Sequence, residues 1–271
     1  MTSFLFWNLN RKPTQSLISR LSSRHEVDVI MLAECSIPPA TLLKELNQMN
    51  PPLYHYIPQL GCTKIQMFTR FSGRFIPPVY ETDRLTIRHL RLPGLTDILL
   101  AVAHFMSKMH WSEDDQAFEC GPLAEAIREV ETNVGHSRTV LVGDFNMNPF
   151  ESGVASAGGL HAVMSRGIAA KTERVVQNRA YPFFYNPMWS LLGDASNGPP
   201  GTYYYSGSGH KVFFWNMFDQ VLIRPALLDR FHNTDLEVVT GDGAASFLTP
   251  KGLPNSKLAS DHLPILFRLG L

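Results

Sequence analysis

Short apolar runs rich in β-branched and aromatic residues recur along the chain, and several end in polar residues. Runs of this kind, bounded by turn-forming residues, are typical of β-strands. The predicted strands cover residues 4–10, 27–35, 64–71, 85–92, 97–106, 138–146, 213–223 and 263–269.

Amphipathic stretches lie between the runs, with Leu, Ile and Val recurring at three- and four-residue spacing. This spacing predicts surface helices over residues 13–24, 39–49 and 120–134. Strands that alternate with helices favour an α/β or α+β fold in which helices cover a sheet. Residues 185–211 are instead rich in Gly, Pro, Ser, Asn and Tyr, which predicts a long binding or lid loop within one domain.

The composition is that of an ordinary globular protein, with 271 residues of which 44% are hydrophobic and 18% charged. A formal net charge of zero excludes a global basic field, so a polyanion must be held by a local site. Three cysteines without a CxxC pair, no signal-peptide pattern and no long apolar run favour a cytoplasmic enzyme with no membrane association.

Several predicted strands end in a residue that could bind a metal, position a water or transfer a proton. Taken singly, each has an ordinary structural explanation as a cap, a turn former or a satisfied core residue. Buried carboxylates are costly unless they are paired or bind metal, however, and these strands can deliver side chains to one sheet edge. The residues are Asn8, Glu34, His104, Asp144, Asn146 and Asp219, to which we add Asp261 and His262.

The stretch "GDFNMNP" resembles the start of an EF-hand loop, but Pro149 and Ala155 stand where glycine and glutamate are required. His and Cys residues show no tetrahedral zinc spacing, and there is no HExxH. Asp, Glu and Asn oxygens suit Mg²⁺, with Mn²⁺ as the other option. Walker A, GxGxxG and GxSxG signatures are all missing.

The motifs "WNLN", "LAEC", "AVAHF", "GDFNMNP", "FDQVLI" and "SDHLPI" resemble, in this order, those of the endonuclease/exonuclease/phosphatase superfamily, the DNase I-like proteins. The resemblance runs from Asn8 to His262. It implies one domain over residues 1–271, a four-layered sandwich of two stacked mixed β-sheets flanked by helices. It also implies phosphoester hydrolysis with a divalent cation.

The resemblance also implies roles for single residues. Glu34 and Asn8 would bind Mg²⁺, with Asp261 assisting nearby. Asp144 would orient or deprotonate the attacking water, and Asn146 would hold water or a phosphoryl oxygen.

His262, oriented by Asp219, would contact the phosphate or act as a general base. His104 would be the general acid, as in DNase I-like members. Ala33 departs from the family pattern, which often has glutamine at this position.

The loops are the only guide to the substrate, because this fold serves several functions. Arg11 and Lys12 follow the Asn8 strand and could contact phosphate, although a solvated charge pair is the equal alternative. His210 and Lys211 lie among aromatic residues that could stack bases, or that could instead belong to a core strand.

A nuclease acting on nucleic acid is therefore favoured. The alternatives are a phosphatase or phosphodiesterase of small-molecule or inositol phosphates, and a catalytically silent binding module.

Overall fold

Two β-sheets stacked face to face form the centre of the computed structural model, which describes residues 1–271 except 50–52 and 110. The six-stranded sheet has the order β16 (Leu236–Val238), β17 (Ile265–Leu269), β1 (Thr2–Asn8), β2 (Val29–Ala33), β4 (Ile65–Thr69) and β3 (His55–Ile57). The seven-stranded sheet has the order β5 (Pro78–Glu81), β6 (Leu85–Leu90), β7 (Ile98–His104), β8 (Thr139–Asp144), β15 (Asp219–Ile223), β12 (Phe184–Tyr185) and β9 (Ala162–Val163). Both sheets are mixed, since β1 pairs with β2 and β7 pairs with β8 in parallel.

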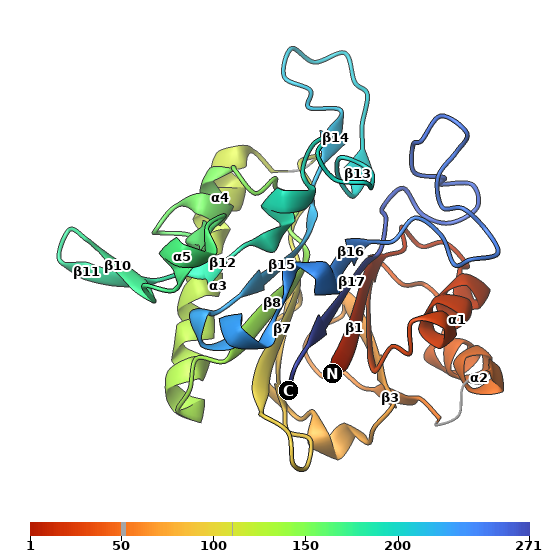
Figure 1. The fold of residues 1–271 in the computed structure, drawn as a ribbon, viewed down its shortest axis with the longest axis horizontal. Coiled ribbons are helices and arrows are strands. Elements are labelled where there is room, and N and C mark those ends of the chain that lie inside the picture. The colour runs from red at the N-terminus through yellow and green to blue at the C-terminus, as the bar shows by residue number, and fades with distance from the viewer. Residues whose placement is uncertain (50–52, 110) are drawn as a thin grey trace.

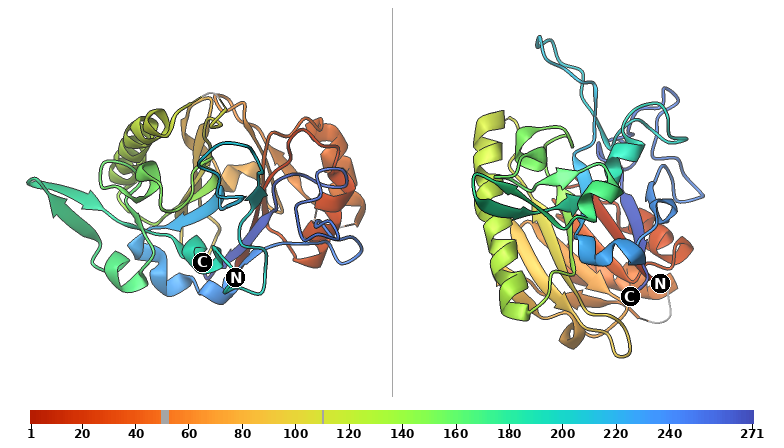
Figure 2. Two further views of the ribbon diagram at one scale, coloured as in Figure 1. Left: turned by 90° about the horizontal axis from the view of Figure 1, so that it is seen from above. Right: turned by 60° about the vertical axis from the view of Figure 1, so that its left-hand side comes forward.

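Helices cover the two outer faces (Figures 1 and 2). The side chains of α1 (Gln15–Arg24) and α2 (Pro39–Met49) join one apolar cluster with Trp7 of β1. On the other side α3 (Glu113–Val134) packs on the seven-stranded sheet, and Ile127 joins the cluster of Leu141. A third cluster, between the sheets, contains Phe4 and Val142. This arrangement confirms the predicted four-layered sandwich.

Shorter elements complete the chain, and two of its strand pairs lie outside the large sheets. The pairs are β10 (Glu173–Val176) with β11 (Arg179–Pro182), and β13 (Tyr203–Tyr204) with β14 (Trp215–Asn216). The remaining helices are α4 (Ser152–Ala155), α5 (Arg166–Ala169), and the 3-10 turns η1 (Gly73–Phe75), η2 (Pro187–Leu191), η3 (Pro225–Arg230) and η4 (Asn233–Asp235). Both hairpins project from the body in Figure 1.

Each predicted strand region holds a strand, but three regions differ from their predictions, and the short strands β3, β5, β9–β12 and β16 were not predicted. Helix α3 begins at Glu113, seven residues before the predicted start at 120, because Ser112 and Asp115 form a capping box. The predicted strand 213–223 is divided between β14 and β15, and Phe213 and Phe214 lie outside it. Phe214 has a φ of 62° and is 51% exposed, so it belongs to a turn and not to a core strand. Residues 185–211, predicted as one loop, contain η2 and β13.

No helix in the described ranges, including the 22-residue α3, is apolar enough over a sufficient length to cross a membrane.

The contact between β7 and β8 depends on Gly143. A Cβ atom at Gly143 would lie 1.9 Å from the carbonyl oxygen of Ala103, which belongs to the backbone of the neighbouring strand. Because neither atom is on a flexible side chain, a substituted residue must push the two strands apart.

We therefore predict that Gly143→Ala lowers the free energy of unfolding by about 1–3 kcal/mol, as overpacking does. Denaturant unfolding of the variant measures this change. Gly158→Ala is the matched control, since a Cβ there meets no atom within 4 Å. Equal stability of the two variants would contradict the prediction.

Candidate active site

The ends of five strands meet at one edge of the sandwich, the upper edge in Figure 1. Asn8 ends β1 and Glu34 directly follows β2, its parallel neighbour. In the other sheet, Asp144 at the end of β8 lies opposite both His104 of β7 and Asp219 of β15. The pairing register therefore places these five polar side chains at one level, as the strand-end pattern predicts.

Hydrogen bonds connect the two sheets at this edge. The amide nitrogen of Asn8 donates to Asp144 Oδ2 at 2.8 Å and lies 3.5 Å from Glu34 Oε1. The Nε2 atom of His104 lies 3.5 Å from Glu34 Oε1 and 3.8 Å from Asp144 Oδ2. Asn8 and His104 thus hold both carboxylates from opposite sheets.

His262 enters the site on the loop that leads into β17, and several contacts fix this loop. The carbonyl oxygen of His262 accepts the indole N–H of Trp7 at 2.9 Å, and the Ser260 hydroxyl donates to the Asn8 carbonyl oxygen at 2.8 Å. The ring of Tyr203 lies against His262, with 4.7 Å between centroids. The imidazole is therefore held in place by β1 on one side and β13 on the other.

The His262 ring connects two carboxylates of the other sheet. Its Nδ1 lies 2.8 Å from Asp219 Oδ2, and its Nε2 lies 3.9 Å from Asp144 Oδ2. Burial lowers the pKa of His262, but the charges of Asp219 and Asp144 outweigh burial and raise it above the usual value. Burial also raises the pKa of Asp219, which stays above its usual value although the charge and hydrogen bond of His262 act to lower it. The two groups therefore share a proton across the 2.8 Å hydrogen bond, and we assign that proton to the imidazole because Asp144 also faces the ring.

Negative charge accumulates at this edge without a lysine or arginine to balance it. In the described part of the chain, only histidines lie within ion-pair distance of Glu34, Asp144 and Asp219. The Glu34 side chain is 31% exposed and therefore accessible from solvent, whereas those of Asp144 and Asp219 are buried. Carboxylate oxygens with an open side are a suitable site for a hydrated divalent cation such as Mg²⁺. The Asn8 amide would join such a site by turning its oxygen, which accepts the Asn10 backbone N–H at 3.0 Å, toward the carboxylates. The residues present are thus suited to the metal that the sequence predicts.

Two residues of the site have left-handed backbone conformations. Glu34 has a φ of 46° and Asn146 a φ of 51°. Asparagine adopts this region readily, and the Asn146 backbone N–H donates to Asp144 Oδ1 at 2.9 Å. Its side-chain nitrogen donates to the Phe105 carbonyl oxygen at 3.1 Å. Glutamate has no such preference, so the position of the Glu34 carboxylate is maintained against backbone strain.

The other residues predicted for the site lie around the Glu34, Asp144 and Asp219 carboxylates and make no hydrogen bond or ion pair with their side-chain oxygens among the described residues. Asp261 is half-buried beside His262, and its Oδ1 lies 3.3 Å from the Ser260 hydroxyl oxygen. The backbone N–H of Arg11 donates to the Glu34 carbonyl oxygen at 2.9 Å, while its side chain is exposed. Lys12, next to it, is half-buried. Arg11 thus lies at the edge of the site.

The segment between β13 and β14 carries the remaining two. His210 is exposed, and Lys211 Nζ pairs with Glu113 Oε1 of α3 at 2.6 Å. No contact of either residue with the site carboxylates occurs among the described residues.

A buried amide network beneath the site was not predicted from the sequence. Asn148, in "GDFNMNP", donates to Asn216 Oδ1 at 2.9 Å and accepts the Met217 N–H at 2.9 Å. Gln220 donates to the Met147 carbonyl oxygen at 2.6 Å and accepts from Asn186 at 2.8 Å. Asn148 therefore fixes the loop and is not oriented as a metal ligand. The unusual density of asparagine near the strand ends was the available signal.

A pocket of about 300 Å³ opens beside His104. It is mostly apolar, and its walls include Tyr80, Arg84, Phe105, Trp111 and Leu123. Of the site residues described above, only His104 lines this pocket, which can hold a small group beside the imidazole.

Known structures share this fold. A protein described as "endonuclease/exonuclease/phosphatase family protein from Leptotrichia buccalis C-1013-b" is 15% identical with a TM-score of 0.56, and the match covers 100% of both chains. An AP endonuclease from Archaeoglobus fulgidus is 12% identical with a TM-score of 0.57, again with 100% of both chains covered. The 3' phosphatase NExo (D146N) from Neisseria, bound to a product DNA hairpin, is 14% identical with a TM-score of 0.58 and the same coverage.

These identities are low, so the three likenesses establish the fold alone. No curated protein matches the sequence. The sequence does match a family pattern over residues 5–262, a range that includes all the strand ends described above. The chain belongs to the Endonuclease/Exonuclease/phosphatase family.

Proposed function

We propose that this chain, a phosphoester hydrolase by its family, is a divalent-metal-dependent nuclease that cleaves nucleic-acid phosphodiesters. The observation that carries the proposal is the convergence of Glu34, Asp144 and the Asp219–His262 pair at one edge, without a lysine or arginine in ion-pair contact among the described residues. Such an edge attracts a divalent cation, and a cation there can receive a phosphate. Because both sheets contribute residues, the proposal treats residues 1–271 as one catalytic domain.

In the proposed reaction, Glu34 and Asn8 hold the metal, Mg²⁺ or Mn²⁺, and Asp261 assists from beside His262. The bound ion supplies charge neutralisation for the phosphate and its leaving oxygen. Asp144 accepts a hydrogen bond from the attacking water and takes up its proton. Its own hydrogen bonds from Asn8 and from the Asn146 backbone fix the direction of that contact.

The histidines and Asn146 act on the phosphate. His262, held at 2.8 Å by Asp219, donates from Nε2 to a phosphoryl oxygen, and the charge of the imidazolium strengthens that bond. Asn146 holds the water or a second phosphoryl oxygen. His104 lies between the carboxylates and the pocket, where it can give a proton to the leaving oxygen.

A cluster of three aromatic residues, two of them exposed, supports nucleic acid as the substrate. Phe150 lies edge-on to Phe213 with 5.2 Å between centroids, and Trp189 lies 6.4 Å from Phe150. Phe213 is 45% exposed, and Lys211 lies over its ring at 5.8 Å. Bases can stack on such rings while Lys211, His210, Arg11 and Lys12 meet the backbone. Of the similar structures, the Neisseria 3' phosphatase is bound to a DNA hairpin and the Archaeoglobus fulgidus protein is an AP endonuclease, which agrees with this substrate.

One observation favours a second candidate, a phosphatase or phosphodiesterase of small-molecule or inositol phosphates. The pocket beside His104 is of a size to enclose a small leaving group. Its mostly apolar walls are poorly suited to a polyanionic inositol phosphate, so this candidate ranks second. The three free cysteines agree with a reducing compartment, and the proposal places the protein in the cytoplasm.

We predict that Asp144→Ala and His262→Ala each lower turnover by about 10²-fold or more, because each removes a group that acts on the transition state. Cleavage is measured on plasmid, single-stranded DNA, RNA and a soluble phosphodiester, with Mg²⁺ or Mn²⁺. His232→Ala, an exposed histidine distant in sequence, is the control. Wild-type turnover by either site variant would refute the roles assigned here.

Metal removal gives a second prediction. EDTA should abolish cleavage, and added Mg²⁺ or Mn²⁺ should restore it, since the carboxylates alone repel a phosphate. The same four substrates decide between the candidates: cleavage of only the soluble ester would replace the nuclease with the second candidate. Full activity in EDTA would contradict the metal requirement.

The strained backbone of Glu34 gives a third prediction. Glu34→Gly should abolish cleavage while raising the free energy of unfolding by about 1 kcal/mol, because glycine adopts the left-handed region without the steric cost. Glu34→Ala, which removes the same carboxylate but keeps a Cβ, is the matched control for the strain. Thermal and denaturant unfolding compare the two. Lower stability of the glycine variant than of the alanine variant would show that the site stores no strain at this residue.

A further inference from the structure

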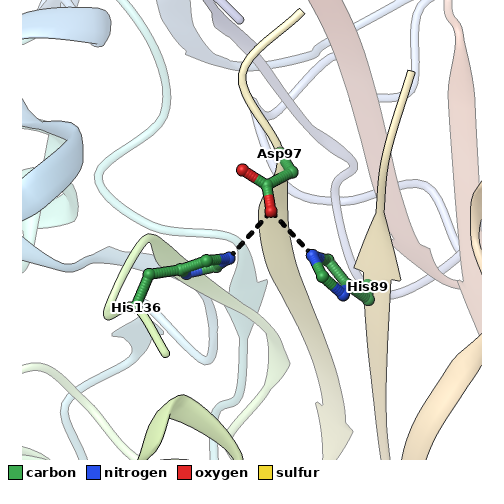
Figure 3. A group of neighbouring side chains, drawn as sticks. All are labelled: His89, Asp97 and His136. Carbon is green, nitrogen blue, oxygen red and sulfur yellow. Dashed lines mark hydrogen bonds and ion pairs between the residues drawn. The ribbon is translucent and has the colours of Figure 1, made fainter. Parts of the chain in front are cut away.

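A second cluster of side chains of metal-binding types lies in the seven-stranded sheet, at the ends of the strands opposite to the proposed active site. His89 belongs to β6, Asp97 directly precedes β7, and His136 lies between α3 and β8 (Figure 3). Since β7 separates Asp97 from His104 by seven residues at about 3.3 Å each, the cluster is roughly 23 Å from the proposed active site. No residue of the cluster takes part in the proposed reaction.

The three side chains point at one another. Asp97 Oδ2 lies 2.8 Å from His89 Nε2 and 3.1 Å from His136 Nε2, as the dashed lines in Figure 3 show. The three ligand atoms all lie within 4.8 Å of one another. Ligands bonded to a tetrahedral Zn²⁺ at about 2.0–2.1 Å are about 3.3 Å apart, so a small movement outward would admit the ion.

We propose that His89, Asp97 and His136 bind a zinc ion, with water as the remaining ligand. Two ring nitrogens and one carboxylate favour zinc over Mg²⁺, which prefers oxygen ligands. The side chains of His89, Asp97 and His136 are 14%, 33% and 10% exposed, so solvent reaches the cluster and can complete the coordination. This inference does not depend on the proposed nuclease activity.

Arg138 holds the carboxylate in position for this role. Its Nε donates to the Asp97 carbonyl oxygen at 2.8 Å, and its guanidinium pairs with Asp97 Oδ1. The other oxygen, Oδ2, is thereby directed at the two imidazoles. Burial works against the charge of Asp97, but hydrogen bonds from His89 and Arg138 outweigh it and hold its pKa below the usual range.

Two features limit the affinity. The positive charge of Arg138 opposes a cation nearby. In addition, His136 Nδ1 accepts the Arg138 backbone N–H at 3.2 Å, so in the metal-free protein Nε2 carries the proton and donates it to Asp97. Zinc must displace that proton from Nε2. The neutral ring then carries its proton on Nδ1, which can no longer accept the Arg138 N–H at 3.2 Å. We therefore expect weaker binding than at a structural site with four protein ligands.

A bound ion would connect three segments that are separate in sequence. His89 lies in β6, Asp97 at the end of the β6–β7 connection, and His136 in the α3–β8 connection. Because zinc binds the folded arrangement and not the separated segments, it should stabilise this edge of the sheet. The opposite edge, where the proposed reaction occurs, would not change.

Cobalt spectroscopy of the full chain tests the site, since Co²⁺ replaces zinc and absorbs visible light when tetrahedral. We use the Asp144→Ala chain, which lacks a ligand of the other possible cluster, Asp144–Asp219–His262. After removal of metal with a chelator, one equivalent of Co²⁺ should produce tetrahedral bands that Zn²⁺ abolishes and Mg²⁺ does not. Calorimetric titration with Zn²⁺ should give the same stoichiometry.

Variants of the cluster identify the ligands. His89→Gln and His136→Gln should each weaken Zn²⁺ binding by about tenfold or more, the size of effect typical for supporting and binding groups of metal sites. His232→Ala, an exposed histidine outside the cluster, should bind zinc normally. In the chain with wild-type Asp144, neither glutamine variant should change the rate of phosphodiester cleavage.

The outcomes are distinct. Absence of the cobalt bands would overturn the proposal, and so would equal zinc binding by the two glutamine variants and the parent. The cluster would then be a hydrogen-bonded group that only joins the three segments. Circular dichroism of the metal-free variants shows that they fold. Should a glutamine variant fail to fold, Asp97→Asn replaces it, since asparagine keeps the shape of the side chain and removes its charge.

Discussion

The hydrogen bond between Asn8 and Asp144 joins the two sheets at the edge where the polar strand ends meet. Asn8 comes from β1 and Asp144 from β8, and neither sheet alone contains both. The bond is 2.8 Å long, and it can form only where the distance between the two sheets brings the Asn8 and Asp144 side chains together. The apolar cluster between the sheets sets that approach, and the geometry of the site thus depends on the packing of the core.

Within the seven-stranded sheet, the geometry of the site also depends on the close contact between strands β7 and β8. Gly143 allows the two backbones to lie together, and the next residue of β8 is Asp144. The parallel register then places His104 beside Asp144, while the antiparallel register of β15 places Asp219 on the other side. Local backbone sterics therefore determine which titratable groups are neighbours.

The two edges of the seven-stranded sheet have different electrostatic characters. At one edge, the carboxylates of Asp144 and Asp219 are buried with histidines as their only ion-pair partners among the described residues. At the other, Asp97 has a guanidinium as well as two imidazoles. The end of the sheet with Asp144 and Asp219 carries excess negative charge, which suits a hard cation. The end with Asp97 is nearly balanced, and a metal ion there must compete with Arg138.

The strained residue in the site shows the cost of this arrangement. Glu34 adopts a left-handed conformation that glutamate disfavours, and its carboxylate faces the Asn8 amide nitrogen and the His104 imidazole. Contacts around it, such as the Arg11 N–H on its carbonyl oxygen, maintain the conformation. Stability elsewhere in the sandwich therefore supports a local geometry that would not form in isolation.

The sequence by itself determined the longer strands, the main helices and the polar residues at strand ends, because side-chain periodicity and turn residues are local properties. It also indicated the family. Short strands such as β3, β9 and β16 were not predicted. Tertiary structure decided the rest. The start of α3 depends on a capping box. Phe213 and Phe214 precede β14, which itself precedes β15, and apolar periodicity cannot reveal the left-handed conformation of Phe214. His89, Asp97 and His136 carry no common motif, since only the pairing of β6, β7 and β8 makes them neighbours.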